Sequence, residues 1–338
     1  MSLVCFELES LPLVLAFKWM RGRAFVIPAE AVGPRPRNGW CCRELDLQSQ
    51  VLQYVLSGIT VGSIYAIIAL GFSLIFNAVE IVNLAQGEFV MLGAMLAVFT
   101  LSATGMPLIL AVLVSVVVVS LVGALLGMAS VHRLQKSSPI SLIIITIGAS
   151  IFFKGCAMLL WGKDALALPA FSAGVSVNVA GASIVPQSLW VFGITALMVV
   201  GVYLFYGHTT VGKAMRAVAV NKHGARLVGI NVNQMIIWAF GISAGLGAVG
   251  GVIVAPITLA SYDMGTMLGL KGFCAAILGG LGSGGGAIAG GLILGVLESL
   301  GAGLISSAYK DAIAFVIMLL ILFVRPTGLF GGGAADGR

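Results

Sequence analysis

Several ionisable residues lie in or beside long apolar stretches, where their charge needs an explanation: Glu80, Glu88, Lys154, Lys271 and Glu298. A charge near the centre of a bilayer costs at least about 2.5–3.5 kcal/mol, so each needs a partner, a protein interior or water. Glu298 lies deep in its stretch, and we expect it to pair inside the protein. Lys154 and Lys271 have long side chains, which we expect to extend outward.

Glu88 stands out because the polar and small residues Asn83, Gln86 and Gly87 precede it. Two interpretations stay open: the group breaks a helix and lines a pathway, or Glu88 makes a structural hydrogen bond between helices. The Gly-rich segment 279–286 also leads into an apolar stretch, a weak hint of interrupted, repeated helices. The predicted pathway residues are Asn83, Gln86, Gly87, Glu88, Gly280 and Gly282.

The segment 207–230 is basic, has no acidic residue and is too polar to cross a membrane. Its apolar residues Met215, Ala219, Ala225 and Val228 can form faces at helical spacing. Small residues would let another protein approach closely. The segment is either a loop that only sets the orientation or, as we favour, a docking helix for a soluble motor subunit. The predicted docking residues are Gly212, Lys213, Ala214, Arg216, Ala217, Asn221, Ala225 and Gly229.

Cysteine and histidine do not occur with the spacing of a metal site. There is no CxxC pair, and the three histidines, His132, His208 and His223, lie far apart in the sequence within predicted cytoplasmic loops. We expect no metal, no structural disulfide at Cys41 and Cys42, and no catalysis. Asp263, beside Tyr262, falls in a predicted outside loop, where it either meets a partner protein or is solvated.

The composition predicts that the helices carrying these residues are surrounded by lipid. Of 338 residues, 59% are hydrophobic and 9% are charged, and the mean hydropathy is +1.11. Ordinary soluble domains carry about 25% charged residues, so this surface requires lipid. The 46 glycines suit helices that pack closely in a membrane. The net charge of +6 comes without a polar surface, which argues against nucleic-acid binding.

Apolar stretches long enough to cross a bilayer predict an all-α, polytopic transmembrane helical bundle with about 8–9 membrane segments. The two segments that flank residue 282 are short and broken by glycine, which predicts half-helices or a re-entrant hairpin. The predicted segments are 52–76, 80–103, 108–131, 139–161, 188–206, 231–254, 267–281, 284–304 and 309–324.

Basic loops predict the orientation. The loops at 132–138 and 207–230, and Arg325, should be cytoplasmic, whereas 162–187 and 255–266 should lie outside. Residues 1–46 do not fit, because their basic residues would then lie outside. One explanation is that region 52–103 is not two plain spans. We favour the other, that residues 1–46 are a disordered extension, which a start codon assigned too early would produce. The membrane domain is then 47–331, and 332–338 is a short cytoplasmic tail.

Separate segments carry a family resemblance in the right order along the chain. Segment 83–94 resembles a first-half signature, 212–217 with Asn221 and 225–230 looks like a coupling loop, and 279–291 and 325–331 match a C-terminal half. The family is that of the branched-chain amino-acid ABC permeases, and the resemblance covers about 50–331. The chain departs from it at Lys222-His223-Gly224, where Gly224 weakens a helix by about 1 kcal/mol relative to Ala.

The resemblance implies a division of labour in the bacterial cytoplasmic (inner) membrane. Two permease subunits, identical or paralogous, form the pathway; ABC ATPase subunits dock on their coupling loops; and a periplasmic substrate-binding protein delivers an amino acid, branched-chain by default. The chain has no GxxxxGKS/T phosphate loop. ATP and Mg²⁺ would therefore bind the partner ATPases, and this chain would be no enzyme and carry no cofactor.

Two other classes of membrane protein compete with this interpretation. An ion-coupled secondary transporter of small polar solutes would use Glu80, Glu88 and Glu298 and need no partner. A channel would also need none. The docking segment favours the permease, because neither alternative requires a small-residue helix there.

Overall fold

The computed structural model describes residues 17–20, 23–26, 39–134, 139–172, 177–179 and 182–330. The chain divides into two compact units, Met1–Gln48 and Ser49–Arg338. In the first unit, strands β1 (Phe17–Met20) and β2 (Arg23–Val26) form an antiparallel hairpin. The predicted extension 1–46 otherwise falls mostly outside the described residues, as do the loop residues 135–138 and the tail 332–338.

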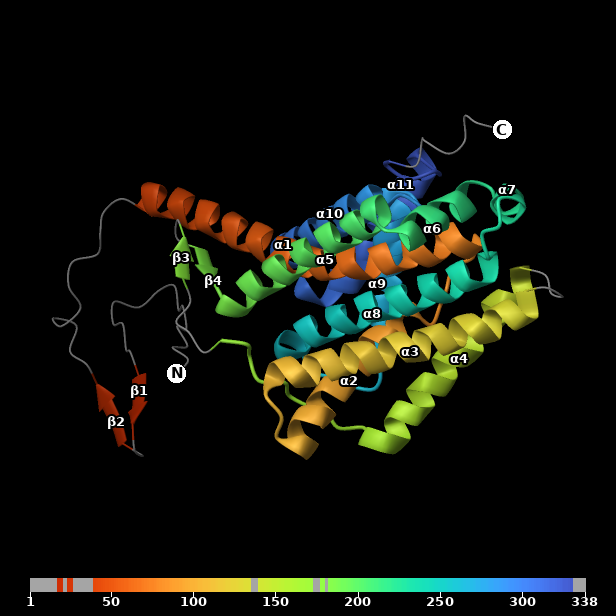
Figure 1. Ribbon diagram of the computed structural model, residues 1–338. Helices are drawn as coiled ribbons and strands as arrows, with labels where there is room; N and C mark the ends of the chain where they lie inside the picture. The colour runs from red at the N-terminus through yellow and green to blue at the C-terminus, as the bar shows by residue number, and fades with distance from the viewer. Residues whose placement is uncertain are drawn as a thin grey trace. The chain divides into compact units, whose positions relative to one another are not determined.

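The second unit is a helical bundle, as predicted (Figure 1). Its helices are α1 (Gly39–Val79, which begins in the first unit), α2 (Gln86–Thr104), α3 (Leu108–Leu134), α4 (Pro139–Trp161), α5 (Pro186–His208), α6 (Thr210–Val220), α7 (Lys222–Leu227), α8 (Val232–Thr258), α9 (Met264–Gly279), α10 (Gly284–Leu304) and α11 (Lys310–Val324). A 3-10 turn (Ser307–Tyr309) precedes α11, and strands β3 (Val177–Val179) and β4 (Ala182–Ile184) form a hairpin between α4 and α5.

Eight helices in the described part of the chain are long and apolar enough to cross a membrane, and α9 is a shorter apolar helix. The protein is therefore a multi-pass membrane protein. Helices α1 and α8 form the centre, since 83% of each apolar span is buried, whereas only 11% of α5 and 6% of α11 are buried. The outer helices expose large apolar side chains such as Leu159 and Phe323, which lipid solvates.

Glycines let the central helices touch backbone to backbone. A Cβ atom on Gly251 of α8 would lie 1.9 Å from the carbonyl oxygen of Val90 in α2. One on Gly295 of α10 would lie 2.3 Å from the Cα of Gly62 in α1. This close approach is how membrane helices associate without a hydrophobic drive, and it explains the high glycine content.

The predicted segment 80–103 is wrong at its start. Helix α1 ends at Val79, Glu80 has a left-handed φ of 63°, and α2 begins only at Gln86. Gln86 then lies beside Ser243, in the interior of α8, so α2 begins inside the bundle. Region 52–103 thus holds two helices, both long and apolar enough to cross a membrane, and the second starts among the other helices of the bundle. Near residue 282, α10 is full length, while α9 is the shorter helix and starts at Met264.

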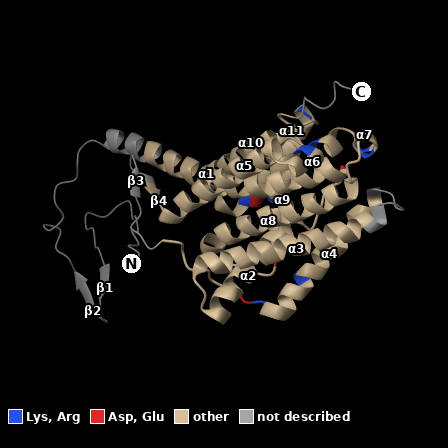
Figure 2. Cartoon of the chain, in the orientation of Figure 1, with Lys and Arg blue, Asp and Glu red and all other residues tan. Residues whose placement is uncertain are grey.

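Charge distinguishes the two ends of the bundle (Figure 2). We call the end that carries α6 and α7 the basic end. Among the described residues there, Glu80 is the one acidic residue. The basic residues of this end are Lys213, Arg216, Lys222, Arg226 and Arg325. The opposite end holds charges of both signs, two lysines and three aspartates: Lys163, Lys310, Asp164, Asp263 and Asp311.

Candidate functional site: a docking surface, a helix junction and a membrane cleft

The basic segment 207–230 folds into two short helices, α6 and α7, each started by a side-chain cap. The Thr209 hydroxyl accepts a hydrogen bond from the Gly212 N–H (2.9 Å), and the Asn221 side-chain oxygen accepts one from the Gly224 N–H (2.9 Å). Gly212 is needed at the turn, since a Cβ there would lie 2.2 Å from the Phe205 carbonyl oxygen. Gly224 occupies the first turn of α7, where it completes the cap.

One side of α6 and α7 packs on the bundle and the other is free. Met215, Val218 and Ala225 are buried, and α6 contacts both α5 and α8. Val228, predicted to form an apolar face with Ala225, is 76% exposed, whereas Ala225 is buried. We define the docking surface by its exposed residues, which combine basic and large apolar side chains: Lys213, Arg216, Val220, Arg226, Leu227 and Val228.

The other predicted docking residues frame this surface. Ala214 and Ala217 are half-buried beside it, and Asn221 caps α7. Gly229 has a φ of 86°, which favours glycine, at the turn that leads back toward α8. The predicted docking residues thus all lie on or beside one surface, formed by α6, α7 and the turn that follows α7.

The first turns of α2 and α9 meet in a helix junction within the bundle. A Cβ on Gly87 would lie 2.2 Å from the carbonyl oxygen of Gly265. Glu88, 1% exposed, accepts hydrogen bonds at Oε1 from Ser150 (3.1 Å) and Thr266 (3.4 Å). The carboxylate lies near the N-terminal ends of both helices, where the backbone dipoles favour negative charge.

The other polar residues that precede Glu88 are also buried and bonded. Gln86 Nε2 donates to the Ser243 carbonyl, and the one proton of the Ser243 hydroxyl is shared between Gln86 Oε1 and the Gly71 carbonyl oxygen, each 2.8 Å away. The Asn83 side-chain oxygen accepts from the Ala85 N–H (3.1 Å). Glu88 therefore makes the hydrogen bonds between helices that the structural interpretation expects, to α4 through Ser150 and to α9 through Thr266. Its pathway role stays a prediction, supported by a small pocket of about 200 Å³ beside it and by Glu88 Oε2, which has no hydrogen-bond partner among the described residues.

The predicted glycines of the second pathway segment lie elsewhere. Gly280 (φ 97°) and Gly282 (φ 90°) form the turn between α9 and α10, and Asn77 donates to the Gly282 carbonyl (2.9 Å). Asn77 lies near the end of α1, at the basic end, whereas Gly87 contacts the opposite end of α9. The structure does not bring the two predicted segments together.

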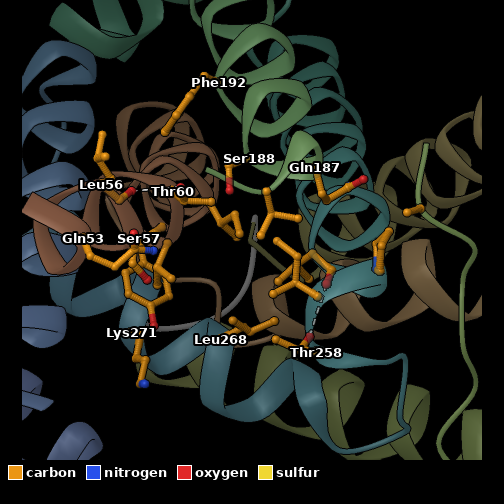
Figure 3. A pocket seen from close by; sticks show the side chains of 18 of the residues that line it. Gln53, Leu56, Ser57, Thr60, Gln187, Ser188, Phe192, Thr258, Leu268 and Lys271 are labelled. Atoms are coloured by element: carbon orange, nitrogen blue, oxygen red, sulfur yellow. Dashed lines mark hydrogen bonds between the residues drawn. The ribbon is translucent and has the colours of Figure 1, made fainter. Parts of the chain in front are cut away.

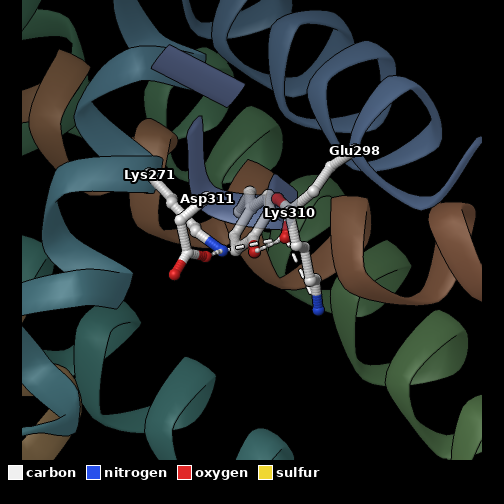
Figure 4. A network of polar contacts seen from close by, with 5 residues as sticks. Lys271, Glu298, Lys310 and Asp311 are labelled. Carbon is white, nitrogen blue, oxygen red and sulfur yellow. Dashed lines mark hydrogen bonds and ion pairs between the residues drawn. The ribbon is translucent and has the colours of Figure 1, made fainter. Parts of the chain in front are cut away.

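A buried ion-pair network joins α9, α10 and α11 (Figure 4). Lys271 Nζ lies 2.8 Å from Glu298 Oε1 and also pairs with Asp311, while Lys310 Nζ lies 3.5 Å from Glu298. Tyr65 of α1 donates to Glu298 Oε1 (3.3 Å). Glu298 pairs inside the bundle, as predicted. Lys271 does not extend outward, because it is only 6% exposed and held by two carboxylates.

Lys154 does reach a polar boundary. Its Nζ lies 3.5 Å from Thr266 Oγ1 and 5.8 Å from the ring centre of Tyr262, beside the predicted outside loop. The ammonium is therefore not left alone against lipid.

A membrane cleft of about 460 Å³ opens at the end opposite α6 and α7, between α1, α5, α8 and α9 (Figure 3). Its lining includes the half-buried Gln53 and Ser183, the exposed Thr258, and the buried Tyr65 and Lys271. Its walls are mainly apolar, with several hydroxyl groups. Sequence reasoning missed this cleft because its lining comes from helices far apart in the chain.

Comparison with known proteins identifies the family. Residues 54–322 match the model of "Branched-chain amino acid transport system / permease component". The chain is 34% identical to the high-affinity branched-chain amino acid transport system permease protein BraD of Pseudomonas aeruginosa, over 83% of this chain and 95% of that protein.

A second relative, LivH of Escherichia coli, is also 34% identical with the same coverage. The ribose import permease protein RbsC of Escherichia coli is 32% identical over 41% of this chain and 45% of that protein. The residues that match the family model, 54–322, include the helix junction, the docking surface and most of the cleft lining. The chain thus belongs to the family of permease components of branched-chain amino acid transport systems.

Proposed function

We propose that this chain is the membrane permease subunit of an ATP-driven importer of amino acids, with branched-chain amino acids as its substrates, in the bacterial cytoplasmic membrane. The partners are ABC ATPase subunits, a second permease subunit and a periplasmic substrate-binding protein. ATP and Mg²⁺ bind the ATPases, and this chain contributes the pathway and no catalytic group.

The observation that carries the proposal is the exposure of apolar side chains on the docking surface. Val220 is 88% exposed and Leu227 is 89% exposed. Helices α6 and α7 have 11 and 6 residues, too few to span a bilayer, so a transmembrane position does not account for this exposure. Exposed apolar residues rimmed by basic ones indicate a protein partner, and by the positive-inside rule this end faces the cytoplasm, where an ATPase would dock.

The contacts of α6 and α7 provide a route for coupling. A force on α6 reaches α5 through the short joint at Thr209, and α8 through direct packing. Lys222 at the start of α7 pairs with Glu80 (3.4 Å), which begins the non-helical segment that leads into the helix junction. When ATP brings two ATPases together, α6 and α7 move with them, and the bundle switches between inward-facing and outward-facing states.

The pathway residues in this proposal are those of the helix junction: Asn83, Gln86, Gly87 and Glu88. An interrupted helix exposes polar groups within the membrane, and it bends more readily than a continuous one. Gly280 and Gly282, which lie at the far end of α9, act in this proposal as the flexible turn between α9 and α10.

Uptake of radiolabelled leucine into proteoliposomes tests the function. The chain is reconstituted with its ATPases and second permease, and the binding protein is added to the side opposite ATP. Uptake should require ATP and stop with an ATPase variant that binds but does not hydrolyse ATP. Uptake driven by a proton or sodium gradient without ATP would contradict the proposal and favour a secondary transporter.

A further inference from the structure

The membrane cleft has the make-up of a site for a small amphipathic molecule. It combines apolar walls, including Leu56, Ile64 and Phe192, with the hydroxyl groups of Ser57 and Ser188 on opposite walls (Figure 3). Small-molecule sites are typically apolar clefts with a few convergent polar groups. A volume of about 460 Å³ accommodates a free amino acid and is far too small for a folded partner.

Charge on the wall favours a ligand that carries a carboxylate. Two ammonium groups, those of Lys271 and Lys310, belong to residues that line the cleft, and no Asp or Glu is among the described lining residues. Lys271 is committed to Glu298 and Asp311. Lys310 is different: its side chain is 44% exposed, and its one ion pair within the described part of the chain is long, at 3.5 Å from Glu298.

Lys310 therefore retains the capacity to bind an anion. An ammonium group has three donors, and a single long contact to an oxygen that Lys271 also holds at 2.8 Å leaves most of that capacity unused. The buried pair of Lys271 and Glu298 holds Glu298 Oε1 in place, and this is the oxygen that Lys310 contacts. Lys310 thus projects from the start of α11 at the cleft wall, with the apolar walls within reach of a ligand side chain.

From this juxtaposition we infer that the membrane cleft binds the amino acid in transit. Lys310 holds its carboxylate, the apolar walls of α1, α5 and α8 hold its branched side chain, and the Ser57 hydroxyl accepts a hydrogen bond from its ammonium group. This inference rests on the proposed function, and it places the first membrane contact of the substrate within one permease subunit, at the end opposite the docking surface.

Cysteine protection in the assembled importer tests the inference. Ser188→Cys is made in an otherwise cysteine-free chain and modified from outside with a membrane-impermeant methanethiosulfonate reagent. Leucine, delivered by the binding protein, should slow the modification several-fold. Ser102→Cys, at the exposed end of α2 outside the cleft, is the matched control, and its rate should not change with leucine.

Substitution of Lys310 tests the carboxylate contact. Lys310→Gln should remove the protection of Ser188→Cys and raise the KM for uptake by roughly tenfold, the scale of a charge-assisted hydrogen bond. Lys310→Arg should restore both, which separates binding from misfolding. Lys163→Gln, a cation in the loop after α4 that does not line the cleft, should change neither.

The outcomes separate this inference from the proposed function. ATP-driven leucine uptake without leucine protection of Ser188→Cys would overturn the inference and leave the function intact. Slow modification that is the same with and without leucine would assign the cleft to a lipid, which also overturns the inference. Absence of ATP-driven uptake by the unmodified assembly would instead remove the proposed function.

Discussion

At the scale of single residues, burial and pairing decide what each ionisable group does. The sequence showed that Glu298 needed a partner, because an unpaired charge in an apolar stretch is too costly. It could not show that the partner is Lys271, 27 residues away, or that Asp311 and Tyr65 complete the network. Lys271 was expected to extend outward because its long side chain permits it, but two carboxylates hold it inside.

Breaking the buried pair should destabilise the protein strongly. Lys271→Met leaves Glu298, which is fully buried, without its closest cation, and the expected loss is about 3–5 kcal/mol. The double variant Lys271→Met/Glu298→Met removes both charges and should recover much of that loss. Unfolding in detergent with increasing denaturant measures all three proteins. A double variant no more stable than the single one would contradict this account.

At the scale of elements, the close contact between α2 and α9 depends on glycine. Polar and small residues at 83–87 raised a helix break as one of two interpretations; residues 83–85 are non-helical, whereas Gln86 and Gly87 begin α2. They did not indicate that the break precedes Gln86 or that its partner is the first turn of α9 rather than the turn at 279–286. Contacts between elements depend on which glycines face each other, which a single sequence does not reveal.

Gly87→Val should separate α2 from α9. The added side chain meets the backbone at Gly265 and Gly269, which cannot move aside as a flexible side chain would. Overpacking of this kind costs about 1–3 kcal/mol, so the midpoint of thermal unfolding in detergent should fall. Gly148→Val is the matched control, because nothing lies within 4 Å of its added Cβ. Equal effects of the two substitutions would show that the contact at Gly87 is not tight.

The docking surface is the second element whose role can be tested by substitution. Arg216→Glu and Leu227→Asp place negative charge on exposed positions of α6 and α7, so folding should be unaffected while ATPase binding falls at least about tenfold. Co-purification of the ATPase with the tagged chain measures this. Gln234→Asp, an exposed residue at the start of α8 near the same end, is the control. Full ATPase recovery with both variants would exclude a docking role for this surface.

At the scale of the whole molecule, most of the membrane segments followed from apolar length alone. The windows predicted for α3, α4 and α10 lie within a few residues of the observed helices, because a bilayer requires a fixed apolar length. The cleft could not be predicted, since it joins residues such as Gln53 and Lys310 from opposite ends of the chain. The short hairpin β3–β4 in the loop after α4 was also missed.

The orientation of the bundle links these scales, because the docking surface can meet an ATPase only in the cytoplasm. Leu227→Cys, in a cysteine-free chain, reports this directly: it is exposed, and α7 is too short to be drawn into the bilayer as a span. A membrane-impermeant maleimide should label it in inside-out vesicles, with bound ATPase blocking the reaction, and should not label it in right-side-out vesicles. Labelling of Leu227→Cys in right-side-out vesicles would place the docking surface outside the cell and contradict the account.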